Sequence, residues 1–317
     1  MARAYGIRAT MKGAFEDTYG TAPTTGWRSL PFVSSSLGSQ QGLIEDDLVG
    51  TGRNAEAPIQ DVINADGDVV APADLRNLGW WLKLLLGTPT STQKDAPDDG
   101  FYEHVYESGE DELPSASIEI GHPQVPTFFV NSGVRCDQMQ VQLQRSGQAN
   151  ITFQMIAQGE DRETTTVEAS PDTYDLRRFN QFQGSIKSDG STLGNVTSAS
   201  VTFNNGIERV ETIRDDGKID GADPTVARMT GSITVRFANT DLLAKAEGFE
   251  AVELEFGYRI DDNRRLQIVG HEIYLPKPKQ QVSGPGGIEA TYEFQAAKDE
   301  NGDLMTITLT NDIEDYA

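Results

Sequence analysis

Strict alternation of apolar and polar residues is the feature of this sequence that most limits its fold. Five segments follow this period of two: residues 117–120, 139–143, 151–155, 232–237 and 252–256; a sixth, residues 196–203, is rich in β-branched residues. Successive side chains of a strand point to opposite faces, so each segment predicts a strand with one buried and one polar face. Antiparallel sheets with one solvated face show this pattern, and the sequence therefore predicts a mainly β fold.

Two segments predict helices beside the sheet. Leucines recur at helical spacing over residues 75–86, with Asp74 as the expected N-cap and Gly87 just past the end. Trp80 and Trp81 widen the apolar surface, so this helix either packs deep against a sheet or also meets a partner subunit. A second, more polar helix is expected over residues 240–247.

The chemistry-bearing residues exclude most enzyme classes. The chain has one cysteine, Cys136, and three histidines far apart in sequence, so neither a disulfide nor a zinc site is expected. It contains no serine-hydrolase elbow and no phosphate-binding loop. The acidic loop at residues 215–221 resembles half of a calcium loop, but Ala227 stands where a bidentate Glu is required. We therefore expect no catalytic residue, no cofactor and no metal.

The charge balance limits the partners. There are 49 Asp and Glu against 26 Lys and Arg, a formal net charge of −23. Such a surface repels phosphate backbones, so specific nucleic-acid binding is not expected. No apolar run approaches the roughly 20 residues of a membrane span, so no membrane association is expected. The acidic excess has a second explanation, adaptation to a salt-rich habitat.

The two halves of the chain resemble each other. Residues 35–45 align without gaps with residues 199–209, and each segment leads through an acidic strand (46–49 and 210–213) and a polar loop toward a helix. The order of later strands also matches, including 102–106 with 253–256 and 117–122 with 266–271. Alternating β sequences also resemble each other by composition alone. The duplication predicts an N-terminal arm (1–23), a first module (24–159), a linker (160–173), a second module (174–311) and a C-terminal tail (312–317).

The N-terminal region carries an ordered set of motifs. Residues 16–23 read Glu-Asp-Thr-Tyr-Gly-Thr-Ala-Pro, a strand-like segment follows at 30–37, and the Leu-rich helix ends in Leu-Gly at 86–87. In this order the sequence resembles the major tail tube protein of tailed bacteriophages, best over residues 10–90. The resemblance implies modules built as a β-sandwich or half-barrel with a flanking α-helix.

The resemblance also implies a function. Subunits of this family form rings that stack into a hollow tube, through which DNA leaves the capsid without specific binding. Rings usually contain six modules, so two modules per chain imply a trimeric ring with pseudo-sixfold symmetry; a hexameric ring is the alternative. The implied partners are further copies of the chain and other tail proteins, such as the tape measure and terminator. The implied location is the virion tail, after assembly in the host bacterial cytoplasm.

Two sets of residues are candidates for these roles. The candidate lumen acids lie at matching positions of the two halves: Glu45, Asp47, Glu208 and Glu211. The candidate inter-ring contacts lie in the polar loops 50–58 and 214–223: Arg53, Asn54, Asp215, Asp216 and Asp220. The simpler interpretation is that these acids only make an outer surface soluble.

Two other functional classes remain open from the sequence. The first is a β-sandwich carbohydrate-binding module in which exposed Trp27, Trp80 or Trp81 would stack on sugar rings. The second is an acidic hydrolase using two carboxylates, although no sequence feature singles out a pair.

Overall fold

The computed structural model describes residues 3–45, 47–50, 52–279, 284 and 286–316. The strands of the first half are β1 (Thr10–Phe15), β2 (Arg28–Ser29), β3 (Ser34–Ser35), β4 (Gly38–Ile44), β5 (Ile59–Pro72), β6 (Thr90–Gln93), β7 (Tyr102–Glu107), β8 (Ala116–His122), β9 (Thr127–Leu143), β10 (Asn150–Ala157) and β11 (Gly159–Glu163). Those of the second half are β12 (Gly184–Ser188), β13 (Ser191–Thr192), β14 (Val196–Asn204), β15 (Glu208–Val210), β16 (Gly221–Asp223), β17 (Arg228–Arg236), β18 (Val252–Asp261), β19 (Arg264–Tyr274), β20 (Glu289–Ala297) and β21 (Met305–Asn311). The helices are α1 (Leu78–Leu86) and α2 (Asp241–Gly248), and short 3-10 turns lie at Gly6–Arg8 and Gln181–Gln183.

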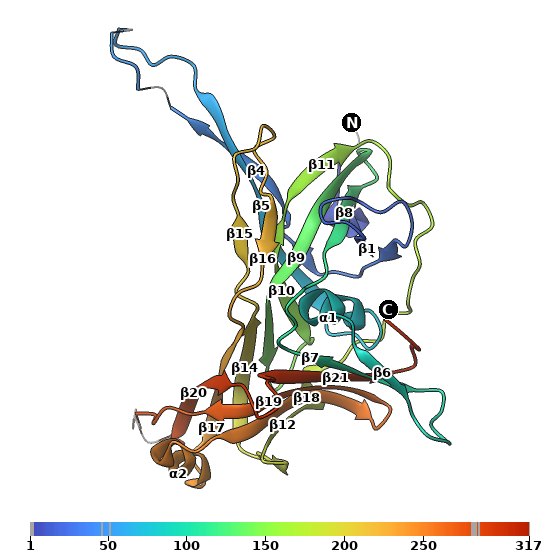
Figure 1. Cartoon of the computed structure of the whole chain (residues 1–317). Helices are drawn as coiled ribbons and strands as arrows, with labels where there is room; N and C mark the ends of the chain where they lie inside the picture. Colours follow the sequence, from blue (N-terminus) through green and yellow to red (C-terminus); the bar gives the residue numbers. More distant parts are fainter. Residues whose placement is uncertain (1–2, 46, 51, 280–283, 285, 317) are drawn as a thin grey trace.

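One antiparallel sheet runs through both halves of the chain (Figure 1). Its central order is β5–β10–β9–β14–β17–β20–β19–β18–β12. The long strand β9 makes this continuity possible: its first part pairs with β8 and β11, and its last part with β10 and β14. A second junction forms where β21 pairs with both β19 and β7. The predicted mainly β fold is confirmed.

Both halves contribute to one large hydrophobic core. Helix α1 lies at its centre, and all of its residues except Lys83 are buried. The Trp81 ring stacks on Phe153 of β10 with centroids 5.4 Å apart. Of the two interpretations of this helix, deep packing against a sheet is therefore the one the structure supports.

The start of α1 differs from the sequence-based expectation. The helix begins at Leu78, and Asn77 is its N-cap residue. Asp74 is fully buried and accepts hydrogen bonds from the backbone N–H groups of Asn77 at 2.6 Å and Arg177 at 2.5 Å. It therefore ties the turn before the helix to the second half of the chain. Helix α2 begins one residue after the predicted start and ends at Gly248.

The terminal segments are part of the packed structure. Strand β1, in the segment expected to be an arm, pairs with β8. At the other end, Tyr316 is buried, and its hydroxyl donates to the backbone oxygen of Arg76 at 2.5 Å and accepts from Asn311 at 2.8 Å. Its ring lies so close to Gly79 of α1 that a Cβ there would approach it to 2.3 Å. The C-terminal segment thus packs against α1.

Candidate functional site

The central sheet presents one continuous polar face. Alternation along β9, β10, β14, β17 and β20 places the apolar side chains in the core and the polar ones on the opposite surface. That surface carries mainly amides and hydroxyls: Gln138, Gln140, Gln142, Thr152, Gln154, Ser198, Ser200, Thr202, Thr230, Ser232, Thr234, Thr291 and Gln295. We call this surface the polar sheet face. It was missed in the sequence analysis, although the alternating Gln and Ser/Thr residues of β9 and β14 are visible there.

Charge on the polar sheet face is confined to its margins. Residues 138–143 of β9, 150–157 of β10 and 199–204 of β14 contain no Asp, Glu, Lys or Arg, while Arg135, earlier in β9, pairs with Ile156 of β10. Acids lie on the flanking strands, Asp66 and Asp68 on β5 and Glu289 and Glu293 on β20, and two arginines, Arg228 and Arg236, lie at the two ends of β17. A surface of this kind offers a phosphate backbone no cation to bind across its centre.

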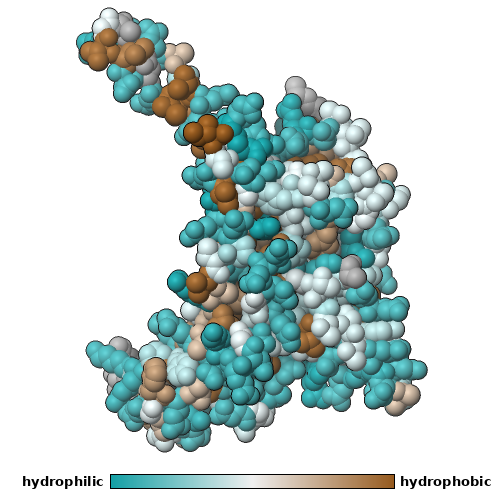
Figure 2. All heavy atoms as spheres, viewed as in Figure 1, coloured by the Kyte–Doolittle hydropathy of each residue, from teal (hydrophilic) through white to brown (hydrophobic). Residues whose placement is uncertain are grey.

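A long hairpin projects beyond the body of the molecule. Strands β4 and β5 extend outward at the upper left of Figure 1, and Figure 2 shows apolar residues along this projection. Its exposed apolar side chains are Leu43, Ile44, Leu48, Val49, Ile59 and Val62. An exposed apolar series on a projecting element is typical of a protein–protein contact.

The candidate lumen acids lie on or beside the two hairpins, away from the centre of the polar sheet face. Glu45 and Asp47 are exposed in the connection between β4 and β5, and Glu208 and Glu211 are exposed at the start of β15 and just after it. The strand expected over 46–49 is absent from the described residues 47–49, while Asp46 lies outside the described part. In the second half the strand expected over 210–213 lies earlier, as β15 at Glu208–Val210, and residues 211–213 are outside any strand.

The candidate inter-ring residues lie in the two exposed hairpin loops. Arg53 and Asn54 are exposed in the loop of the projecting hairpin. In the second loop, Arg214 donates to Asp216 and Asp220 at 2.8 Å each. The hydrogen bonds from Arg214 hold the pKa of Asp216 below its usual range, so this carboxylate stays charged. The loop with half of a calcium motif is thus organised around an arginine.

The N-terminal motif has a structural role. The carboxylate of Glu16 accepts hydrogen bonds from the backbone N–H of Gly20 and Gly133, both at 2.8 Å. It also accepts from the hydroxyls of Ser115 at 2.8 Å and Ser117 at 2.6 Å. A single side chain therefore fastens the turn after β1 to both β8 and β9.

The tryptophans do not form a sugar platform. Trp27, Trp80 and Trp81 are only 2%, 5% and 1% exposed. A side chain that stacks on a sugar ring must present its face to solvent, so these three residues cannot serve that role. Within the described residues, no helix is long and apolar enough to cross a membrane.

Comparison with known proteins identifies the family. The model of the phage tail tube protein family matches residues 6–296. The chain belongs to the phage tail tube protein family. Phage tail tube proteins are structural proteins of the virion tail that assemble with copies of themselves and other tail proteins, and they are not enzymes. No curated protein matches this chain.

Proposed function

We propose that this phage tail tube protein forms rings of three chains that stack into the tube, with two tandem modules in each chain. The observation that carries this proposal is the common hairpin register of the two halves. Three pairs in the hairpin of β4 and β5 are Ser35 with Val69, Gly38 with Asp66, and Ile44 with Ile59. Adding 164 to each number gives three pairs of the second half: Ala199 with Ile233, Thr202 with Thr230, and Glu208 with Asp223.

Two glycines support the same correspondence. A Cβ on Gly67 would lie 2.4 Å from the backbone oxygen of Ser36, and one on Gly231 would lie 2.1 Å from that of Ser200. Gly231 and Ser200 follow Gly67 and Ser36 by 164 residues each. The close backbone approach therefore recurs at the same point of each hairpin.

The order of the strands supports it too. The first half runs β4–β5–β10–β9–β8–β1, and the second half runs β14–β17–β20–β19–β18–β12. A helix follows the hairpin in each half, α1 after β5 and α2 after β17. This order matches β8 to β18 and β9 to β19. The sequence comparison had matched β7 to β18 and β8 to β19, one strand earlier in the first half. The strand order also draws β1 and β11 into the first module and starts the second at β12.

Substitution of Gly231 by alanine tests the shared backbone contact. The added Cβ would overlap the Ser200 oxygen, which belongs to a paired backbone, so we expect a loss of about 1–3 kcal/mol in the free energy of unfolding. Gly194, whose Cβ would meet nothing within 4 Å, is the control. Urea unfolding of the two alanine variants measures the difference, and equal stabilities would contradict the tight approach.

We further propose that the polar sheet face lines the lumen of the tube. DNA must pass along such a wall without being held, and the centre of this face carries amides and hydroxyls that form no ion pairs with phosphates, while Arg228 and Arg236 lie at the ends of β17. The acids of the flanking strands would repel the duplex over about 8 Å at physiological salt. Glu45, Asp47, Glu208 and Glu211 extend this proposal along the hairpins. The loops with Arg53, Asn54, Asp215, Asp216 and Asp220 would contact the neighbouring ring.

Electron microscopy of the purified chain tests the proposal. We expect stacked rings with a central channel, built of three chains and showing pseudo-sixfold density. Six chains in a ring would contradict the two-module proposal, and a dispersed monomer at high protein concentration would contradict the tube. A map with the polar sheet face on the outer surface would remove the lumen assignment. Assembly in the host bacterial cytoplasm follows from the same proposal.

A further inference from the structure

The chain contains a complete junction between its two halves. At this junction residues 199–204 of β14 pair with residues 138–143 of β9. Asn205 follows, and its side-chain nitrogen donates to the backbone oxygens of Leu85 at 2.8 Å and Cys136 at 3.0 Å. The Ile207 N–H donates to the Asp137 carboxylate at 2.7 Å. The start of the second hairpin is thereby held between the last turn of α1 and the middle of β9.

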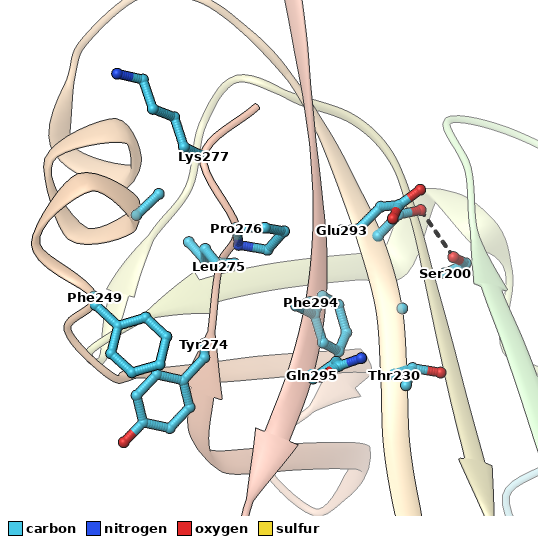
Figure 3. A pocket seen from close by; sticks show the side chains of 13 residues that line it. Ser200, Thr230, Phe249, Tyr274, Leu275, Pro276, Lys277, Glu293, Phe294 and Gln295 are labelled. Atoms are coloured by element: carbon cyan, nitrogen blue, oxygen red, sulfur yellow. Dashed lines mark hydrogen bonds between the residues drawn. The ribbon is translucent and has the colours of Figure 1, made fainter. Parts of the chain in front are cut away.

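In the part of the chain that the structure describes, no strand occupies the corresponding place in the second half. Its helix is α2, and the counterpart of the middle of β9 is the end of β19 and the residues just after it. These elements border a cavity of about 670 Å³ (Figure 3). We call it the α2 cavity. Its lining beside α2 and the end of β19 includes Ala246, Phe249, Tyr274, Leu275, Pro276 and Phe294.

Phe249 in this cavity has a strained and exposed position. It follows the last residue of α2 with φ 52°, a left-handed conformation that is costly for a bulky side chain. The corresponding residue after α1 is Gly87, which adopts positive φ without this cost. Phe249 is 75% exposed, and the centroid of its ring lies 5.0 Å from that of Tyr274. Tyr274 is half-buried, so the pair offers one exposed ring on a fixed support, and aromatic residues in pockets are enriched among the hot spots of protein interfaces.

Asn205 and Ile207 lie at the junction inside the chain, and the segment of the first half that corresponds to them is exposed. By the shift of 164, Gln41 and Leu43 correspond to Asn205 and Ile207. Leu43 is 67% exposed, whereas Ile207 is 8% exposed and packs with Leu113, Ile219 and Ala222. Within the described residues, β4 pairs with β5 alone, whereas β14 pairs on both edges.

We propose that the α2 cavity receives residues 40–43 of a second copy of the chain, with Gln41 and Leu43 in the places that Asn205 and Ile207 occupy within the chain. This proposal rests on the ring proposed above and names its closing contact. The contact is head-to-tail, so the same interface repeated around the ring leaves neither surface exposed.

Strand register makes the proposal specific. Within the chain, Asn204 lies opposite Gln138, which in turn lies opposite Gln154 of β10. Met155 of β10 pairs with Gly67, and Phe294 of β20 pairs with the corresponding glycine, Gly231. The residues before them, Gln154 on β10 and Glu293 on β20, therefore also correspond. Because Gln295 pairs with Tyr274, continuing that register places Glu293 opposite Pro276. The expected inter-chain pair is therefore Gln40 with Pro276.

Proline limits how this contact can form. Pro276 and Pro278 have no N–H group, so a strand beside them forms fewer backbone hydrogen bonds than β14 forms with β9. Side chains must therefore supply more of the affinity. Leu43 entering beside Phe249 and Tyr274 is the contact that we expect to matter most.

The Leu43→Glu variant tests the inserting segment. Leu43 is exposed in the single chain, so the change should leave the fold intact but place a charge in an apolar cavity on assembly. We expect the concentration needed for ring formation to rise by about tenfold or more. Leu176→Glu changes another exposed leucine, outside both hairpins, and should assemble like the unchanged chain.

The Phe249→Gly variant tests the cavity independently of folding. Glycine adopts φ 52° without strain, so the melting temperature of the chain should stay the same or rise. Ring formation should nevertheless weaken, because the exposed aromatic anchor is lost. A variant that assembles as well as the unchanged chain would contradict a role for this ring.

A disulfide between copies tests the register. A chain carrying both Gln40→Cys and Pro276→Cys should, on oxidation, form covalent products of two and three chains. The native Cys136 is fully buried and contributes little background. Gln40→Cys combined with Arg145→Cys, at an exposed turn, is the control pair.

The outcomes separate this contact from the proposed function. Three-chain rings that form no cross-link and tolerate Leu43→Glu would overturn the contact while leaving the tube intact. An unchanged chain that forms no rings would overturn both.

Discussion

Replacing Glu119 with alanine is expected to destabilise the chain by about 3–5 kcal/mol, because the change leaves a buried cation without its partner. Glu119 is fully buried on β8, and its carboxylate accepts a hydrogen bond from the Lys12 ammonium at 2.9 Å. It also accepts from the Thr166 hydroxyl at 2.8 Å and the Val167 N–H at 2.7 Å. The Glu119 side chain therefore connects β8 to two other parts of the chain: β1, and the segment with Thr166 and Val167 that joins the two halves.

A double variant distinguishes the lost charge pair from lost packing. Lys12→Met with Glu119→Gln removes both charges, while the single amide oxygen can still accept from the Val167 N–H and the amide NH2 can donate to the Thr166 hydroxyl oxygen. We expect it to recover most of the stability, measured by urea unfolding of the dispersed chain. If the double variant were as unstable as Glu119→Ala, the buried cation would not be the cause.

Lysines on the polar sheet face are expected to make the tube retain DNA. Thr152 and Thr291 lie at corresponding positions of β10 and β20, and a three-chain ring carrying lysine at both would present 3 × 2 = 6 cations. Contacts to about 6–10 phosphates lose roughly 10³–10⁵ in affinity between 50 and 200 mM salt. Retention of the duplex should therefore be strong at low salt and fall steeply as salt rises.

Co-sedimentation of a short fluorescent duplex with assembled tubes measures this retention. The matched control carries Thr90→Lys and Thr92→Lys on β6, which lies on the other side of the molecule in Figure 1. It adds the same charge per chain outside the proposed lumen. Equal retention by both variants, or none by the first, would contradict the lumen assignment.

Much of the fold was accessible from the sequence because its signals are local. Alternation predicted most of the central strands, and the gapless match of residues 35–45 with 199–209 has the same register as the paired hairpins. Under the proposed correspondence of the halves, the later strands match one position away from the sequence-based matches, because β7 resembles β18 in pattern while β8 takes the place of β18 in the pairing order. Pattern shows that a strand exists, but its partner depends on contacts distant in sequence.

The candidate site was less accessible for the same reason. The acidic excess drew attention to charged residues on the hairpins, whereas the continuous surface of the sheet consists of neutral amides and hydroxyls. Recognising it requires knowing that β9 pairs with β14, more than fifty residues further along the chain. The start of α1 was also missed, because Asp74 binds Arg177 of the distant second half.

In the proposed ring of three chains, the pairing of β21 with β7 would make the contact within a chain stronger than the contact between chains. Inside each chain, the halves are joined by β9 with β14, by β7 with β21, by a shared core and by the polypeptide itself. Between neighbouring chains of the same ring, the proposed contact is that of the hairpin with the α2 cavity. A tube built this way should flex at three hinges per ring instead of six, so bending or swelling of its bore would follow threefold symmetry.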